Sequence, residues 1–401
     1  MGAAITMDGS ASRGCGQKIQ HALEVAGVAV NGGHAFDIRV RNHALFQRAL
    51  RHGQDAIWDA YVDGSWDCPR IDELVFRLLR NGVRIQESAG IRLGLAGVLA
   101  RLLPALRVSQ ASQVRRHYDL GRDLFEAMLD RLMIYSCAFW RNSLTLDQAQ
   151  EAKLDLIARK LLFRPGMRVL DVGCGWGGAA RYLTQNYGVA VVGVTLSLDQ
   201  YEAGTRQCAG LPVEIRLQDY RDVADGPYDA IFSVGMFEHV GCKHYRTYMK
   251  KVRGLLKPGG LSLLHTIGSN SSDRRGNLWV ERNIFPGGML PSARQIAESV
   301  EGLMVIEDWH NFGADYDKTL MAWFANFDAN WPRLRWKYGD RFYRLWKCYL
   351  QMFAGAFRAR HNQLWQVVMS PSGVPGGYAA ERFSEAPSRT ALARGWSATP
   401  R

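Results

Sequence analysis

Apolar and polar positions divide the 401-residue chain into two parts with different patterns. Between residues 17 and about 90, short helical and strand-like stretches alternate with glycine-containing turns, which predicts a small α+β domain. From residue 165 onward, apolar strands alternate with amphipathic helical segments. We expect strands at 168–172, 190–195, 212–217, 229–234 and 260–266, with helices between them that include 198–208 and 243–255. This alternation predicts an α/β fold with a parallel sheet covered by helices on both faces.

An apolar stretch, 91–108, joins the two parts and carries only three charges, at Arg92, Arg101 and Arg107. It fits a buried connector helix that is kinked at Pro104. It fits equally a helix that lies in a membrane interface. Both interpretations stay open at the level of the sequence.

The composition narrows the class of protein. No uninterrupted apolar run reaches the roughly 20 residues that span a bilayer, and the first residues lack a secretory pattern, so we expect a cytoplasmic protein. The seven cysteines are scattered without a CxxC pair, which argues against a disulfide framework and a metal site. The net charge of +12 would attract phosphates or anionic lipid headgroups. The arginines are spread rather than gathered into a stripe, so we do not expect nucleic acid as a partner.

A glycine-rich stretch, VLDVGCGWGG at 169–178, follows the first strand of the α/β part. Three of its glycines satisfy GxGxxG, which alone fits a nicotinamide dinucleotide as readily as another cofactor. A dinucleotide site also needs an acidic residue at the end of the second strand, and that strand ends in Thr195. The carboxylate stands instead before the glycines, at Asp171, and this arrangement favours S-adenosylmethionine (SAM).

Polar residues follow the later strands. Asp219 and Tyr220 close the third strand, where they would offer a carboxylate to the adenine amino group and a ring to its edge. Glu238 follows the fourth strand and His265 ends the fifth, so both are expected on the sheet edge that faces the cofactor. We expect a structural role for His239, because neighbours on one loop point in different directions.

The sequence resembles the cyclopropane-fatty-acyl-phospholipid synthases from about residue 20 to about residue 370. The motifs occur in order along the chain: HYDLGRDLFEAML, YSCAFW, VLDVGCGWGG, VVGVTLSLDQ, LQDYRD, SVGMFEHVG, LLHTIGSN, IFPGGMLPS, EDWHNFGADYDKTLMAW and GAFRAR. It is similar, more distantly, to the mycolic acid cyclopropane synthases, which lack the N-terminal domain. The resemblance implies a class I SAM-dependent methyltransferase fold, Rossmann-like, with a seven-stranded, mostly parallel sheet.

The resemblance also implies an activity. The methyl group of SAM would pass to the cis double bond of a phospholipid acyl chain, and bicarbonate would then remove a proton before ring closure. A C-methyltransferase that leaves a methyl-branched or methylene product without ring closure is the alternative. The resemblance further implies a homodimer that is peripheral on the inner face of the cytoplasmic membrane. We expect an N-terminal lipid-binding domain with its connector over 1–108, a catalytic domain over 109–380 and a poorly ordered tail over 381–401.

The resemblance assigns residues to two sites. The bicarbonate site is expected to contain Glu238, His265, Tyr316, Cys137 and the backbone amide of Ile267. The expected cofactor-binding residues are Tyr135, Ser136, Asp171, Gly173, Gly175, Trp176, Gly177, Thr195, Gln200, Asp219 and Tyr220.

Aromatic residues and a few departures from the family pattern complete the expectations. The reaction passes through a carbocation that must be shielded from water, and nearby rings could stabilise it or simply fill the core. The candidate rings are Phe139, Trp140, Phe237, Trp309, Phe312 and Trp323. Arg122 and Arg131 stand where the family usually has Asn and Pro, in the segment expected to cover the cofactor, and Phe353 stands where some members have Cys.

Overall fold

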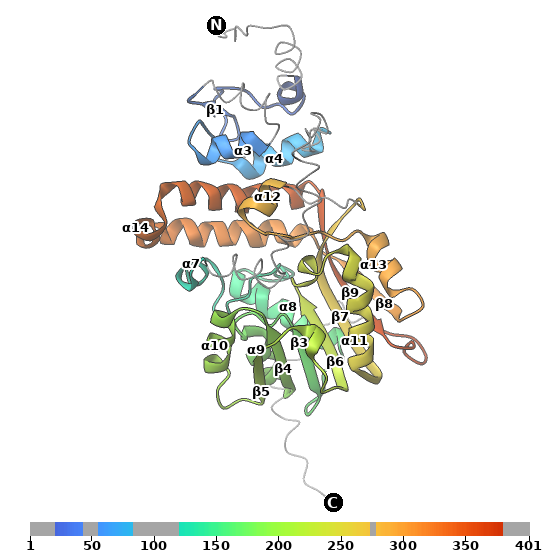
Figure 1. The fold of residues 1–401 in the computed structure, drawn as a ribbon. Helices are drawn as coiled ribbons and strands as arrows, with labels where there is room; N and C mark the ends of the chain where they lie inside the picture. The colour runs from blue at the N-terminus through green and yellow to red at the C-terminus, as the bar shows by residue number, and fades with distance from the viewer. Residues whose placement is uncertain (1–20, 43–54, 83–119, 273–277, 380–401) are drawn as a thin grey trace, which may run out of the picture.

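The computed structural model describes residues 21–42, 55–82, 120–272 and 278–379 (Figure 1). The predicted connector at 91–108 and the expected tail at 381–401 lie outside the described residues. Within these ranges, no helix combines the length and the apolar character that crossing a bilayer requires.

A seven-stranded sheet forms the centre of the larger part of the molecule. In spatial order its strands are β5 (Val213–Leu217), β4 (Ala190–Thr195), β3 (Arg168–Val172), β6 (Tyr228–Val234), β7 (Leu256–Ser269), β9 (Asn362–Ser370) and β8 (Val305–Asn311). Strand β9 is antiparallel to both of its neighbours, and the other pairs are parallel. The five predicted strands are β3 to β7, whereas β8 and β9 were not predicted individually.

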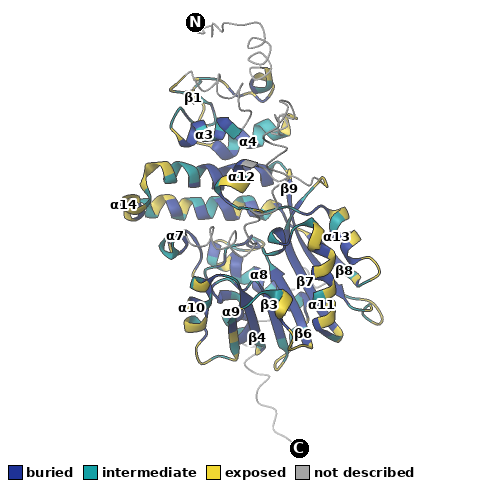
Figure 2. Cartoon of the chain, in the orientation of Figure 1, coloured by how far each residue is buried: buried dark blue, intermediate teal, exposed yellow. Residues whose placement is uncertain are grey.

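Helices cover both faces of this sheet because alternate strand residues are apolar on each side (Figure 2). Val169 packs in a cluster with Leu154 of one helical layer. Leu170 and Val172 pack on the other face with Tyr248. The helices of this part are α7 (Arg122–Met128), α8 (Leu146–Lys160), α9 (Gly178–Tyr187), α10 (Leu198–Gln207), α11 (Tyr245–Leu255), α12 (Leu278–Asn283) and α13 (Ala293–Val300). Short 3₁₀ turns follow the strands at η2 (Tyr220–Asp222), η3 (Phe237–His239) and η4 (Cys242–His244).

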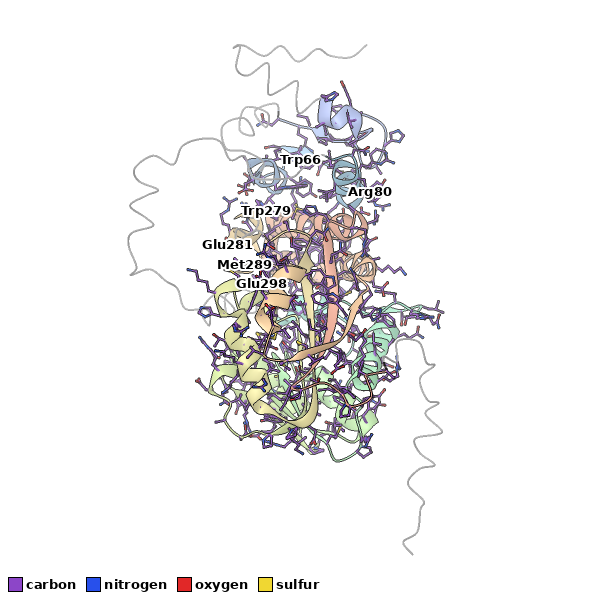
Figure 3. The ribbon with its side chains drawn as sticks, turned by 90° about the vertical axis from the view of Figure 1, so that its right-hand side faces the viewer. Trp66, Arg80, Trp279, Glu281, Met289 and Glu298 are labelled. Atoms are coloured by element: carbon purple, nitrogen blue, oxygen red, sulfur yellow. The ribbon has the colours of Figure 1, made fainter. Side chains whose placement is uncertain are left out.

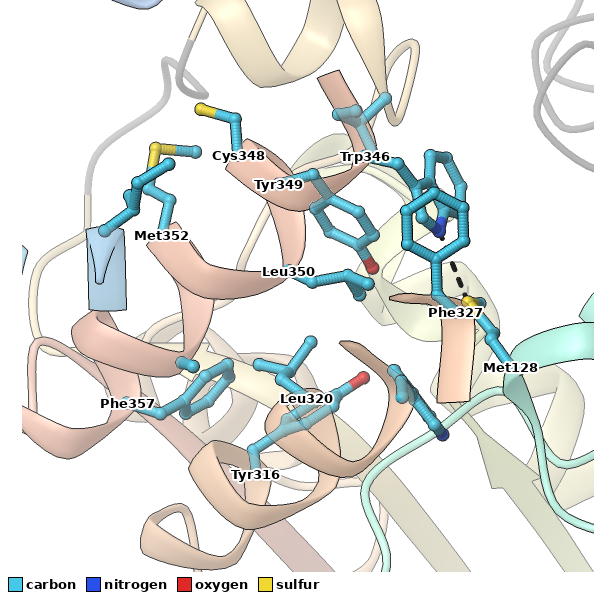
Figure 4. Close-up of a cluster of buried hydrophobic side chains, with 14 of the residues drawn as sticks. Met128, Tyr316, Leu320, Phe327, Trp346, Cys348, Tyr349, Leu350, Met352 and Phe357 are labelled. Atoms are coloured by element: carbon cyan, nitrogen blue, oxygen red, sulfur yellow. Dashed lines mark hydrogen bonds between the residues drawn. The ribbon is translucent and has the colours of Figure 1, made fainter. Parts of the chain in front are cut away.

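Helix α14 (Ala314–Arg358) consists of two arms that lie side by side (Figure 1). The chain reverses at Gly339, whose φ of 76° lies in the left-handed region that glycine adopts without strain. Aromatic contacts hold the arms together, including the stacked rings of Phe327 and Tyr343 with centroids 5.7 Å apart. Figure 4 shows Tyr316 on the first arm and Tyr349 on the second, with their side chains directed into the space between the arms.

The N-terminal residues form a small α+β unit, as predicted, that packs on α14. It contains β1 (Arg39–Val40), α3 (Asp55–Val62), β2 (Trp66–Asp67) and α4 (Ile71–Arg80). The backbone amide of Ile71 donates to Gln351 Oε1 at 2.9 Å. Gly355 allows a close approach of the two helices, since a Cβ there would lie 2.3 Å from the carbonyl oxygen of Asp72. Figure 3 shows Trp66 in the N-terminal unit and Trp279 of α12 in the larger part, on opposite sides of the boundary between these two parts.

Arg358 ties α4 to both arms of α14. Its guanidinium donates to Asp72 at 2.9 Å, to Glu73 at 3.2 Å and to Asp317 at 2.9 Å. Asp72 has no exposed surface, so this buried carboxylate depends on its arginine partners. The N-terminal unit is therefore joined to the helix that carries Tyr316 by charge as well as by apolar packing.

Candidate active site

A cavity lies at the carboxyl ends of β3, β4, β5 and β6. Ten of the eleven residues predicted to bind the cofactor line it: Tyr135, Ser136, Asp171, Gly173, Gly175, Trp176, Thr195, Gln200, Asp219 and Tyr220. Gly177 does not line the cavity. It is the N-cap residue of α9, with a φ of 81°, and it directs the chain from the glycine loop into that helix.

The glycine loop presents bare backbone to the cavity. Gly173 has a φ of 92°, and a Cβ there would lie 2.8 Å from the side chain of Met236. At Gly175, also with positive φ, an added Cβ would meet nothing within 4 Å, and at Gly235 it would meet only Ser136, at 3.8 Å. The chain therefore forms a cradle that side chains would fill, and this geometry fits a cofactor whose amino-acid end approaches the backbone closely.

Hydrogen bonds fix the loops around this cradle. Thr195 Oγ1 donates to Gln200 Oε1 at 2.7 Å and accepts from the backbone amide of Ser197 at 3.2 Å. Trp176 is buried, and its Nε1 donates to Asp199 Oδ2 at 2.7 Å. The glycine loop and the start of α10 are thus held to each other before any ligand binds.

Asp219 is held by its own loop. Its carboxylate caps η2 and receives two hydrogen bonds from the Arg221 guanidinium, at 3.0 and 2.6 Å. Burial opposes ionisation of Asp219, but the Arg221 hydrogen bonds outweigh it and keep the pKa of this carboxyl below its usual value. The Tyr220 ring is fixed by an edge contact with Tyr248 at 5.4 Å. Contact of Asp219 with an adenine amino group stays a prediction.

Two buried ionisable groups, Asp171 and Lys153, line the cavity. Asp171 is 2% exposed, and burial raises the pKa of its carboxyl, opposed by the charge of Lys153. Lys153 of α8 is 0% exposed, and its Nζ donates to Ser136 Oγ at 2.8 Å. Lys153 was not predicted from the sequence. The available signal was its spacing of four from Ala149 and Ile157, which places a lysine on the apolar face of its helix.

The predicted bicarbonate residues lie beside this cavity rather than in its lining. Glu238 Oε1 accepts from the backbone amide of Ile267 at 2.7 Å, and Glu238 Oε2 has no hydrogen-bond partner among the described residues. His265 Nδ1 lies 3.3 Å from Gln366 Nε2. The other ring nitrogen, Nε2, is buried and finds no partner in the same ranges. The structure therefore joins Glu238, which follows β6, to the backbone of Ile267, two residues after His265 in β7. His265 was expected to end its strand but lies inside β7, which continues to Ser269.

Electrostatics set the protonation of this group. Burial raises the pKa of Glu238 to about 7, opposed by its hydrogen bond from Ile267. Burial, with help from Lys153 and Lys160, lowers the pKa of His265 well below its ordinary value, so this imidazole is neutral near pH 7. The pair thus offers a carboxyl that can hold or release a proton at neutral pH and a neutral imidazole beside it.

Cys137 lies in the segment between α7 and α8, and Tyr316 lies in the first turn of α14. Thr319 lies one turn after Tyr316 in α14, and its Oγ1 is 4.0 Å from Cys137 Sγ. Burial and the nearby Asp315 carboxylate raise the pKa of the Cys137 thiol, which keeps it neutral. The Tyr316 ring packs 4.6 Å from that of Phe357.

The candidate aromatic residues divide into two groups. Trp323 packs on Tyr135, and Phe312 packs on His265 and Phe139, so these rings border the two predicted sites. The remaining candidates are placed elsewhere. Phe237 stacks on Tyr245, Trp309 packs on Trp365, and Trp140 Nε1 donates to Thr319. The sequence-based proposal that each could serve the carbocation therefore loses support for Phe237 and Trp309, which belong to a separate core cluster.

His239, like Lys153, was not predicted to line the cofactor cavity. It was expected to point away, but it lies in the cavity wall. Burial lowers the pKa of its imidazole to about 4, so it is neutral there.

The two arginines that depart from the family pattern pair locally, Arg122 with Glu126 in α7 and Arg131 with Glu151 in α8. Neither arginine lines the cavity.

The family model described as mycolic acid cyclopropane synthetase matches residues 106–367. The chain belongs to this family. It is 50% identical over 361 residues to the cyclopropane-fatty-acyl-phospholipid synthase of Escherichia coli strain K12, which covers 90% of this chain and 94% of that protein.

One further relative and one solved structure are also similar to this chain. A probable fatty acid methyltransferase of Pseudomonas putida is 36% identical over 272 residues, covering 65% of this chain and 69% of that protein. The crystal structure of mycolic acid cyclopropane synthase CmaA1 complexed with SAH and CTAB matches with a TM-score of 0.61 and 33% identity, covering 65% of this chain and 98% of that one. The family and the methyltransferase fold predicted from the sequence are confirmed.

Proposed function

We propose that this member of the cyclopropane synthetase family is a cyclopropane-fatty-acyl-phospholipid synthase. It transfers the methyl group of SAM to the cis double bond of a phospholipid acyl chain and then closes a cyclopropane ring. The observation that carries the proposal is the position of Glu238 and His265. Both residues are buried. Glu238 Oε2 and His265 Nε2 have no hydrogen-bond partner among the described residues, and they lie next to a cavity whose glycine loop suits SAM.

The cofactor cavity performs the positioning. When bound, SAM supplies an electrophilic methyl group. The backbone of the glycine loop, with Thr195 and Gln200 on one side and Tyr220 on the other, would hold it in one orientation. An alkene is a weak nucleophile, so fixing the methyl group in line with the double bond is the main contribution that these residues make. The surrounding rings exclude water from the cation that forms on the acyl chain.

Bicarbonate is the base that we propose for removal of the proton. Glu238, His265, Tyr316, Cys137 and the Ile267 amide would surround it. A carboxyl with a pKa of about 7 stays protonated when a second anion binds beside it, so Glu238 Oε2 would donate a hydrogen bond to bicarbonate. Neutral His265 would meet the same anion through Nε2.

We also propose peripheral attachment to the inner face of the cytoplasmic membrane, with the N-terminal domain and connector over 1–108 as the lipid-binding part. The net charge of +12 supports attraction to anionic headgroups. The catalytic domain over 109–380 and a homodimer complete the proposed organisation.

The test is a reaction with purified protein, SAM, bicarbonate and vesicles of cis-unsaturated anionic phospholipid. Mass spectrometry should find acyl chains that are heavier by one CH₂, and proton NMR should find a ring CH₂ in the product. Glu238→Gln should lose the product while keeping affinity for S-adenosylhomocysteine (SAH). Glu298→Gln is the matched control, because Glu298 is an exposed residue of α13 that pairs only with Arg294 among the described ion pairs.

The alternative function is a fatty-acyl C-methyltransferase that does not close the ring. The relative from Pseudomonas putida, a probable fatty acid methyltransferase, gives this possibility weight. A product whose NMR spectrum shows a methyl-branch or C=CH₂ signal, in place of the ring signal, would establish the alternative and refute the synthase.

A further inference from the structure

Lys153 is a buried cation in the wall of the cofactor cavity. It has no exposed surface, and its Nζ donates to Ser136 Oγ at 2.8 Å. In the part of the chain that the structure describes, no carboxylate oxygen lies within 4.0 Å of this nitrogen. A buried ammonium group without an ion pair is costly. We therefore expect a ligand with a negative charge to bind near the Lys153 ammonium, because the described residues place no carboxylate in contact with it.

The two carboxylates nearest in electrostatic effect do not fill this need. Asp130 is buried, and its two oxygens accept backbone amides of Leu132 and Ile134, both at 2.9 Å. Asp171 lines the cavity itself, at the end of β3. One wall of the cavity thus carries a buried acid and a buried base that do not pair directly with each other. The amino-acid end of SAM carries an ammonium and a carboxylate on a single carbon, which is the complementary pattern.

We propose that Lys153, acting through the Ser136 hydroxyl, forms the subsite for the carboxylate of the methionine portion of SAM. The proposal rests on the proposed function, because it takes SAM as the ligand. Ser136 Oγ accepts a hydrogen bond from Lys153, so its own O–H is left to donate to the carboxylate. The ammonium polarises that hydroxyl and balances the charge of the ligand, while Asp171 faces the ligand's ammonium. Lys153 is a positioning residue, since it acts on the ligand through the Ser136 hydroxyl.

Lys160 provides a comparison within the same helix. It is also 0% exposed, but its Nζ lies 3.3 Å from Asp308 Oδ2 and 3.2 Å from His310 Nδ1. It does not line the cavity. The protein supplies a partner for one buried lysine of α8 and leaves the other facing the cofactor site.

Isothermal titration calorimetry tests the proposal with two ligands. One is SAH, and the other is S-adenosyl-3-thiopropylamine, which differs from SAH only by lacking the carboxylate. Wild-type protein should prefer SAH by at least about tenfold, as expected for a charge-assisted hydrogen bond. Lys153→Met should weaken SAH binding by at least about tenfold and change the affinity for the amine by less than about threefold. Lys160→Met should leave the preference for SAH over the amine unchanged.

Each contrary outcome identifies a different error. Equal weakening of both ligands by Lys153→Met would mean that the lysine only supports the fold of the cavity. Unchanged SAH affinity with a higher bicarbonate requirement for turnover would mean that Lys153 serves the base anion instead. If Lys153→Met does not fold, the wild-type preference decides, and a preference below about threefold overturns the subsite. Absence of SAH binding to the wild-type protein would instead refute the proposed function, and the subsite with it.

Discussion

The hydroxyl group of Thr319 should hold the loop that carries Tyr135, Ser136 and Cys137. Thr319 has no exposed surface, and its Oγ1 accepts from the backbone amide of Ala138 at 3.1 Å and from Trp140 Nε1 at 2.9 Å. Thr319→Val keeps the volume but leaves both donors without this acceptor. Each unsatisfied buried donor costs about 1–3 kcal/mol. Because Trp140 is only half-buried, we expect a total loss of about 2–4 kcal/mol in the free energy of unfolding.

Thr205→Val is the matched control. Both threonines lie in helices and donate their hydroxyl to the carbonyl oxygen four residues earlier, Thr319 to Asp315 at 2.9 Å and Thr205 to Tyr201 at 2.8 Å. Thr205 is exposed and accepts no hydrogen bond from a loop, so its replacement should cost about 0.5 kcal/mol or less. Urea unfolding followed by tryptophan fluorescence and circular dichroism measures both. A difference between the two variants below about 0.5 kcal/mol would refute the reasoning, because other acceptors would then serve the loop.

Three further predictions follow from close contacts and buried groups. Gly355→Ala places a methyl group 2.3 Å from the backbone of α4 and should destabilise the fold by about 1–3 kcal/mol, whereas Gly254→Ala in α11, with open space around it, should be neutral or stabilising in urea unfolding. The pKa of Glu238 rises from 4.5 in the unfolded chain to about 7, so the folded state binds the extra proton. Stability is then lost as pH rises through that interval, by roughly 3 kcal/mol, and Glu238→Gln should reduce the loss of stability between about pH 4.5 and 8 by that amount in unfolding experiments. Gln366→Leu removes the partner of His265 Nδ1, so the tautomer of His265 is no longer fixed. The variant should lower kcat by about tenfold or more and leave the affinity for SAH unchanged. Equal losses in kcat and in SAH affinity would refute a role confined to His265.

The alternation of strands and helices in the sequence predicted β3 to β7. It did not predict β8 and β9 individually, because neither shows a simple alternation of apolar and polar residues. Strand β9 (NQLWQVVMS) is buried at all nine positions, so it shows no alternation of apolar and polar residues, and its glutamines are buried too. Strand β8 (VIEDWHN) contains the buried Asp308, whose carboxylate pairs with Lys160 of α8 at 3.3 Å. Such a pairing joins residues far apart in the chain, and local periodicity cannot reveal it.

The shared position of most predicted cofactor residues, around one cavity, was predictable for a physical reason. They follow the ends of consecutive parallel strands, and such ends meet at one edge of the sheet. Lys153 and His239 were not predictable in this way. Lys153 comes from a helix that precedes the first strand, and His239 reaches the cavity because η3 turns Glu238 toward Ile267 and its neighbour the other way.

The strand order explains why the two predicted sites adjoin. The chain builds β3, β4 and β5 outward on one side and then returns to place β6 and β7 on the other side of β3. The loops after β3 and β6 therefore part at the point where the order reverses, and a crevice must open between them. The glycine loop lies on one side of this point, and Glu238 lies on the other. Tyr316 is different, because it comes from α14, which lies above the sheet in Figure 1. Its place depends on the packing of the two arms and the N-terminal unit, so the proposed bicarbonate site requires the tertiary structure and not the strand order alone.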